Sequence, residues 1–175
     1  MTFPLRPFLP VDAPLLAEVF REAIYELAQD DYDEDQRVAW MSVASDEDAF
    51  AERLEAQLTL VALDAGEPAG FISVKDNAHI DMIYVVPGFA REGAGTALMD
   101  AAIKIATARG AAALTADVSD NAKAFFESFG FVGEKRNMVL CEDEYLGNTS
   151  MRKPLNEATS PPANDESGKI TRGKS

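Results

Sequence analysis

The fold is decided by one stretch, in which an apolar strand pattern leads through a glycine turn directly into a helix pattern: Tyr84-Val85-Val86-Pro87-Gly88-Phe89-Ala90-Arg91-Glu92-Gly93-Ala94-Gly95-Thr96-Ala97-Leu98-Met99. Such a junction directs unpaired backbone N–H groups and the positive end of the helix dipole at one point, where they can hold a phosphate. It is not a P-loop, because Gly93 is followed by Ala94-Gly95 rather than by Lys and Ser or Thr. It is not a dinucleotide fingerprint, because Leu98 stands where a third small residue is required. The motif alone leaves open a tight turn that binds nothing.

Upstream of the turn, short β-rich runs predict an antiparallel meander over residues 58–63, 70–74 and 79–86. Two amphipathic helices precede it. The first has Asp12 as its N-cap and an apolar stripe that continues to Leu27. The second opens at Ser45, with Asp48 three residues later in a variant of the capping box.

Downstream, the pattern predicts a helix over 93–109, a strand over 114–118, a helix over 121–129 and a closing hairpin over 131–141 and 145–153. Together these elements predict an α/β (α+β) fold, with a mixed, mostly antiparallel central sheet of about seven strands flanked by about four helices. Residues 1–155 form this domain. Residues 156–175 are polar, and we expect a disordered tail.

The composition fits one domain and excludes several classes of protein. The chain has 175 residues, 47% of them apolar, and a formal charge of 16 − 30 = −14, so nucleic acid is not an expected partner. It has no apolar run of the roughly 20 residues that span a bilayer and no signal-peptide pattern, so we expect a cytoplasmic protein. With one cysteine and one histidine, no intrachain disulfide and no metal site are expected. A monomer or a homodimer is equally compatible with the sequence.

The order of elements resembles the GCN5-related N-acetyltransferase (GNAT) family across about residues 3–155. The family's pyrophosphate loop, Gln/Arg-x-x-Gly-x-Gly/Ala, is similar to residues 90–95 at both glycines. Its aromatic-Glu-x-x-Gly-Phe stretch is similar to residues 126–131. More narrowly, Asp31-Tyr32, Ile80-Asp81 and Asn148 resemble a bacterial branch of uncharacterised YafP-like acetyltransferases.

The resemblance implies acetyl-CoA as co-substrate, with its pyrophosphate on the loop amides and its pantetheine arm along the strand that ends at Val85. The thioester carbonyl would then meet the N–H of Val85 or Val86. Two departures stand out: Ala90 replaces the usual Gln or Arg, and Phe126 replaces a tyrosine that protonates the leaving thiolate in many members. The expected cofactor-binding residues are Tyr84, Val85, Val86, Arg91, Glu92, Gly93, Ala94, Gly95, Thr96, Asn121 and Phe126.

Three residues are candidate catalytic groups. His79 lies 93 − 79 = 14 residues before Gly93, where histone-modifying members carry a glutamate base, and an imidazole ordinarily titrates near neutral pH. Asp81, two residues on, is expected to share its face and orient or charge-stabilise it, with Tyr84 on the opposite face. Tyr145 in the final hairpin is the preferred substitute acid. The alternative for His79 is a strand-end histidine that is hydrogen-bonded to a turn.

The acceptor is expected to be a primary amine, on a small molecule or a peptide, that enters between the early helices and the final hairpin. Its expected contacts are Tyr32, Trp40, His79 and Asp81. Acidic residues within 30–35 and 142–144 either make this mouth anionic or are simply solvated loops. The sequence therefore favours direct acetyl transfer in a ternary complex. The alternatives are a non-catalytic acyl-CoA sensor and a structural subunit that binds no CoA.

Overall fold

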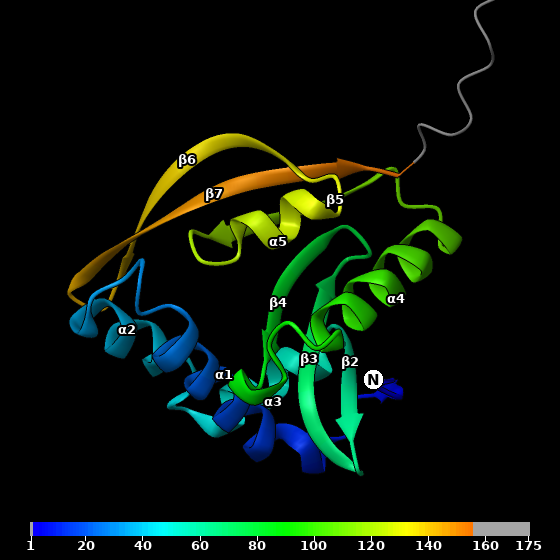
Figure 1. Cartoon of the computed structure of the whole chain (residues 1–175), viewed down its shortest axis with the longest axis horizontal. Coiled ribbons are helices and arrows are strands. Elements are labelled where there is room, and N and C mark those ends of the chain that lie inside the picture. The colour runs from blue at the N-terminus through cyan, green and yellow to red at the C-terminus, as the bar shows by residue number, and fades with distance from the viewer. Residues whose placement is uncertain (1, 156–175) are drawn as a thin grey trace, which may run out of the picture.

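The computed structural model describes residues 2–155 and shows a twisted sheet with helices on both faces (Figure 1). The tail expected at 156–175 lies outside the described residues. The strands are β1 (Leu5–Pro7), β2 (Leu58–Asp64), β3 (Glu67–Lys75), β4 (His79–Val85), β5 (Ala113–Ser119), β6 (Val132–Cys141) and β7 (Glu144–Pro154). The α-helices are α1 (Ala13–Leu27), α2 (Glu34–Met41), α3 (Glu47–Glu55), α4 (Ala94–Ala108) and α5 (Lys123–Ser128).

The seven strands form one sheet in the order β1-β2-β3-β4-β5-β7-β6. All neighbours are antiparallel except β4 and β5, which run parallel and are joined by only two register pairs, His79↔Thr115 and Ile80↔Ala116. Beyond these pairs β4 and β5 diverge, and the β6–β7 hairpin arches away from the meander (Figure 1). The predicted mixed, mostly antiparallel sheet of seven strands is therefore confirmed, with five flanking helices in place of about four.

Two apolar cores lie on opposite faces of the sheet. Helices α4 and α5 pack on one face, where Leu98 and Phe126 are buried, and α1 and α3 pack on the other, where Phe20 and Phe50 are buried. Helix α2 lies beside the β6–β7 hairpin. Burial of the apolar stripes of these helices is the main force that holds the layers together.

Strand β4 contains a β-bulge at Asp81. Val74 of β3 pairs with Ile80, and Ser73 pairs with Met82, so Asp81 is an extra residue without a partner in β3. As a result Ile80 is buried in the α4 core, whereas Met82, two residues later, is buried in the α1 core. The bulge thus reverses the alternation of faces in the second half of β4, which places Tyr84 on the same side as Asp81. The prediction of opposite faces is wrong for this reason.

The helix starts differ in detail from the predicted ones. Helix α3 is capped by Asp46, whose side chain accepts from the Ala49 N–H at 3.0 Å, so the predicted cap at Ser45 is wrong by one residue. Asp12 precedes α1 as predicted, but its carboxylate pairs with Arg6 at 2.6 Å and does not cap the helix. Within residues 2–155, no helix combines the length and the apolar character needed to cross a membrane.

Candidate active site

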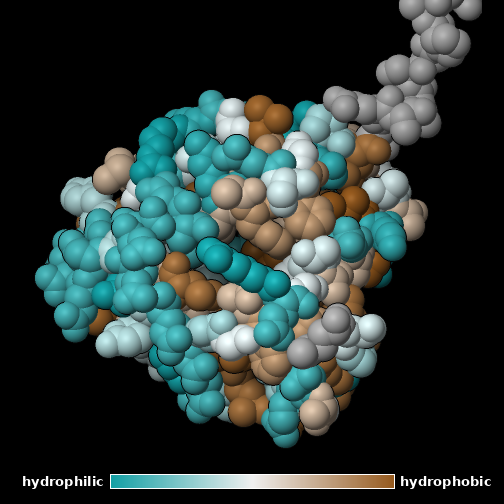
Figure 2. Space-filling view, in the orientation of Figure 1, coloured by the Kyte–Doolittle hydropathy of each residue, from teal (hydrophilic) through white to brown (hydrophobic). Residues whose placement is uncertain are grey.

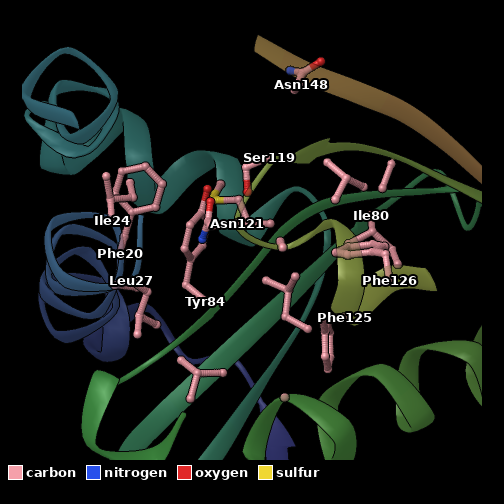
Figure 3. Close-up of a pocket in the computed structure, with 18 of the residues that line it drawn as sticks. Phe20, Ile24, Leu27, Ile80, Tyr84, Ser119, Asn121, Phe125, Phe126 and Asn148 are labelled. Carbon is pink, nitrogen blue, oxygen red and sulfur yellow. The ribbon is translucent and has the colours of Figure 1, made fainter. Parts of the chain in front are cut away.

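One cavity of about 800 Å³ runs from the N-terminus of α4, through the gap between β4 and β5, to a chamber under α1, α2 and the β6–β7 hairpin. Figure 2 shows hydrophobic surface around this hollow and hydrophilic surface over the neighbouring helices. Figure 3 shows Phe20, Ile24 and Leu27 on one side of β4, with Phe125 and Phe126 on the other. The volume is typical of sites that bind small molecules and cofactors.

The N-terminus of α4 presents free backbone donors to one end of the cavity. Gly93 is the N-cap with φ = +103°, a conformation that favours glycine, and the first intrahelical bond joins Ala97 N–H to its carbonyl at 2.9 Å. The N–H groups of Ala94, Gly95 and Thr96 therefore have no partner within the helix. The Glu92 N–H donates to Phe89 O at 3.2 Å, so the predicted use of its amide is wrong.

The glycine turn is built closely against its neighbours. A Cβ on Gly95 would lie 3.3 Å from Phe125 and 3.6 Å from Val85, so a larger residue would intrude into the space where α4, α5 and β4 meet. Arg91 lines the cavity with φ = +67°, and its side chain is exposed. The small residues and free amides fit a pyrophosphate group without a Gln or Arg at Ala90.

Strand β4 also has free amides along the gap. The Val86 N–H donates to Ala69 O at 2.8 Å, which excludes Val86 as the predicted oxyanion donor. Because successive N–H groups of a strand point to opposite edges, the amides of Val85 and Ile83 point away from β3, toward the gap. The sequence analysis missed Ile83. The bulge and the Val86–Ala69 hydrogen bond fix which N–H groups of β4 face β3 and which face the gap, and the sequence pattern shows neither.

His79 is held by β5 and not by Asp81. Its Nδ1 atom lies 2.8 Å from Thr115 Oγ1, and that hydroxyl lies 3.4 Å from Ala78 O. When the Thr115 hydroxyl donates to the Ala78 carbonyl, it accepts a hydrogen bond from His79 Nδ1–H. These two hydrogen bonds assign His79 the tautomer in which Nε2 carries the lone pair. The expected orienting role of Asp81 therefore belongs to Thr115.

Asp81 is instead clamped by α3 and its flank. Arg53 donates two hydrogen bonds to the carboxylate, at 2.7 and 2.8 Å, and Gln57 donates a third at 3.0 Å. Burial raises the pKa of Asp81, but the hydrogen bonds from Arg53 and Gln57 outweigh it and hold the pKa below its ordinary value. Asp81 is thus an ionised carboxylate whose charge is offset by Arg53, which makes it a poor base.

The exposed face of β5 adds a group that sequence reasoning missed. Thr115 and Asp117 alternate with the buried residues Leu114, Ala116 and Val118, so both point to the His79 side of the sheet. Asp117 lines the cavity and accepts from Ser150 Oγ at 2.8 Å. Among the described residues, the carboxylates that line the cavity are those of Asp81 and Asp117, and only Asp81 has an arginine partner. The alternation of polar and apolar residues over 113–119 is the sequence signal that could have identified Asp117 as a residue of this face.

Three aromatic residues form the chamber wall. Trp40 stacks edge-on against Tyr32 at 5.4 Å and Tyr84 at 6.3 Å. The Tyr32 hydroxyl donates to Gly147 O and accepts from the Asp120 N–H at 3.0 Å, which ties the α1–α2 connection to β7 and to the β5–α5 loop. Burial raises the pKa of Tyr84, so this phenol stays protonated at neutral pH. Tyr84 therefore packs on the α1 side of β4, away from the α4 end of the cavity where the sequence analysis expects the cofactor.

Tyr145 and the acidic stretches lie outside the cavity lining. Tyr145 is 58% exposed and does not line the cavity, so its predicted role as an acid is wrong. No residue of 142–144 lines it, and from 30–35 only Tyr32 does, which favours the reading of solvated acidic loops. Phe126 and Asn121 do line it, as the sequence predicts, and Phe126 packs on Phe131 with ring centroids 5.0 Å apart.

Comparisons with known proteins agree with this geometry. Residues 28–155 match the profile of the acetyltransferase (GNAT) domain. The chain is 34% identical to the uncharacterised N-acetyltransferase YafP of Escherichia coli K12 over 148 residues, which cover 85% of this chain and 93% of YafP. It is similar to the crystal structure of a GCN5-related N-acetyltransferase from Rhodopseudomonas palustris, with 50% identity, a TM-score of 0.87 and coverage of 89% and 97% of the two chains. A PaiA N-acetyltransferase from Thermoplasma acidophilum, solved in complex with coenzyme A, shares the fold at 20% identity, with a TM-score of 0.72 and coverage of 88% and 99%.

Proposed function

The chain belongs to the GNAT family of acetyltransferases, and from this premise we propose that it transfers an acetyl group from acetyl-CoA directly to a primary amine in a ternary complex. One observation carries the proposal. A single cavity connects the free amides of α4 to His79 and Asp117 through the β4–β5 gap. Co-substrate and acceptor can therefore meet inside it without a covalent enzyme intermediate.

The two ends of the gap suit the two ends of acetyl-CoA, which supplies the acetyl group as an activated thioester. The amides of Gly95 and Thr96 at the start of α4 would hold the pyrophosphate, aided by the helix dipole. The amides of Val85 and Ile83 would donate to the pantetheine arm and to the thioester carbonyl. Of these, Ile83 lies nearer to His79 along β4, so we assign the carbonyl oxygen to its N–H.

Two residues would prepare the amine. Asp117 would attract the ammonium form, because its carboxylate has no cationic partner among the described residues. His79 Nε2 would then accept the proton, with Thr115 holding Nδ1. Three strand residues lie between His79 and Ile83, which puts the two positions roughly 13 Å apart along β4, so the proton would reach His79 along a chain of waters. The neutral nitrogen attacks the thioester carbonyl and forms the C–N bond, and the C–S bond breaks with its electron pair leaving on the thiolate. The second N–H proton that the nitrogen then loses passes through solvent to the thiolate.

Phe126 favours a second candidate function, a non-catalytic acyl-CoA sensor. Its side chain is 3% exposed and has no proton to give to the leaving sulfur. Transfer remains possible without an acid, because a CoA thiolate is a tolerable leaving group. The two functions differ in one measurable property, which is release of free CoA that depends on an added amine.

The test is a thiol-release assay with acetyl-CoA and a panel of primary amines. The native chain should release CoA only when an amine is present, and His79→Gln should lower kcat by at least about 100-fold. Tyr145→Phe is the matched control, because Tyr145 lies outside the cavity, and it should leave kcat unchanged. If the chain binds acetyl-CoA but no amine in the panel causes release of free CoA, the transfer proposal is rejected and the sensor function is supported.

A further inference from the structure

We infer that the acceptor carries its amine on an apolar body, aromatic or branched aliphatic, and that polyamines and small polar amines are poor substrates. This inference rests on the proposed function and names the substrate class of the same site. It follows from the side chains that line the acceptor chamber and from where the chamber opens.

The chamber walls are apolar on the side of α1 and α2. Phe20, Ile24 and Leu27 lie on successive turns of α1 along the cavity, and the Phe20 ring packs on Tyr84 with ring centroids 4.7 Å apart (Figure 3). Trp40 and Val43 continue this lining from α2 and the turn that follows it. A polar or doubly charged ligand would lose hydration against this wall, because the polar lining residues Ser119, Asn121 and Asn148 come from β5, the segment after it and β7 and not from α1 or α2.

The mouth of the chamber is apolar too. Leu27 is 38% exposed, Val43 39% and Val139 45%, and these side chains come from three separate parts of the chain. Scattered exposed apolar residues are ordinary, but these three border the same cavity. Their convergence indicates a surface that becomes covered when a ligand with an apolar body binds.

The charges of the chamber fit one ammonium group and not two. Asp81 is neutralised by two hydrogen bonds from Arg53, and the acidic residues of 30–35 lie outside the lining. Asp117 therefore remains as the one carboxylate of the described lining that is free of an arginine. A diamine would leave its second ammonium against the apolar wall, which costs binding free energy.

Trp40 makes binding measurable without catalysis. It is the single tryptophan of the chain and it lines the chamber, so its fluorescence reports occupancy there. The full chain, saturated with CoA, is titrated with 2-phenylethylamine, putrescine and ethanolamine. We expect a saturable change with 2-phenylethylamine at a concentration at least about tenfold below that for the other two amines. Equal or tighter binding of putrescine or ethanolamine, or no saturable change with any of the three, would overturn the inference.

A matched pair of variants localises the effect. Leu27→Gln places a polar group at the mouth and should weaken 2-phenylethylamine binding about tenfold. Leu15→Gln makes the same change at a residue of α1 that is 43% exposed and does not line the cavity, and it should have no effect. An equal loss in both variants would contradict the assigned site. The fluorescence titration measures binding and the thiol-release assay measures turnover, so the two proposals can fail separately. Binding of 2-phenylethylamine without amine-dependent CoA release would reject the proposed transfer but support the preference of the chamber for an apolar amine.

Discussion

The His79 imidazole and the Thr115 hydroxyl form a hydrogen bond of 2.8 Å between Nδ1 and Oγ1, across one of the two register pairs that join β4 to β5. The bond lies where the two strands begin to diverge, so it fixes a titratable side chain at the inner end of the gap. Removal of the Thr115 hydroxyl should affect proton transfer more than the fold, because Thr115 lies on the face of β5 that does not pack into the α4 core.

Thr115→Val keeps the shape of the side chain and removes the hydroxyl. We expect kcat for amine acetylation to fall roughly threefold to tenfold, the worth of one hydrogen bond, with the KM for acetyl-CoA unchanged. Thr115→Ser restores the hydroxyl and should restore the rate and the pH profile of the native chain. A Ser variant as slow as the Val variant would show that Thr115 contributes packing and not tautomer control.

Asp117→Asn removes the carboxylate and keeps the acceptor for Ser150 Oγ. We expect the KM for the amine to rise roughly fivefold to thirtyfold, because the ammonium loses its charged partner, while acetyl-CoA binding is unchanged. Steady-state kinetics with the amine varied at saturating acetyl-CoA measures this. An unchanged amine KM would exclude Asp117 from acceptor recognition.

Gly93→Ala tests the cofactor turn against a control with the same backbone strain. Gly93 and Gly110 bracket α4 with φ of +103° and +82°, and a Cβ on either would meet no atom within 4 Å. Each substitution should cost stability of about 1–2 kcal/mol through strain alone. Only Gly93→Ala should also weaken acetyl-CoA binding, measured by calorimetry, because it disturbs the donor amides at the start of α4. Equal affinities in the two variants would place the pyrophosphate elsewhere.

Arg53→Met tests the clamp on Asp81. Without the guanidinium, burial raises the pKa of Asp81, which carbon NMR of the carboxyl group can follow. In the native chain the lowered pKa stabilises the fold fully above the unfolded value of about 3.9, and this stabilisation is lost as the pH falls through the folded value. Since the Arg53 side chain is 41% exposed, solvent screening limits the loss in the variant to about 1 kcal/mol near pH 7.

The control for this prediction is Arg109→Met, which removes an exposed arginine that has no ion pair among the described residues. Urea unfolding at about pH 7 should show a loss only for Arg53→Met, and the difference between the two variants should shrink as the pH falls below about 3.9. A pH-independent loss for Arg53→Met would mean that its aliphatic stem, and not its charge, stabilises the fold.

The fold was accessible from the sequence because its signals are local. The glycine turn before α4, the meander and the closing hairpin each follow from patterns within about 20 residues. The insertion of β7 between β5 and β6 depends on pairing between distant segments, and periodicity does not encode such pairing.

The candidate site was only partly accessible. The position of His79 was predicted, but its partner Thr115 lies 36 residues away in another strand. Strict alternation placed Asp81 and Tyr84 on opposite faces, and the extra residue at the bulge reverses this. The sequence analysis did not select Asp117, because an acidic residue on a strand is usually a solvated surface group. Only the structure shows that a cavity lies beside it.

The proposed activity of this chain is the transfer of an acetyl group from acetyl-CoA onto an amine. The most direct measurement incubates the full chain with acetyl-CoA and 2-phenylethylamine and quantifies N-acetyl-2-phenylethylamine by mass spectrometry beside the CoA released. We expect equal amounts of the two products, both strongly reduced in His79→Gln. Acetyl-CoA binding that is lost in Gly93→Ala, with no N-acetylated product from any primary amine, would contradict it.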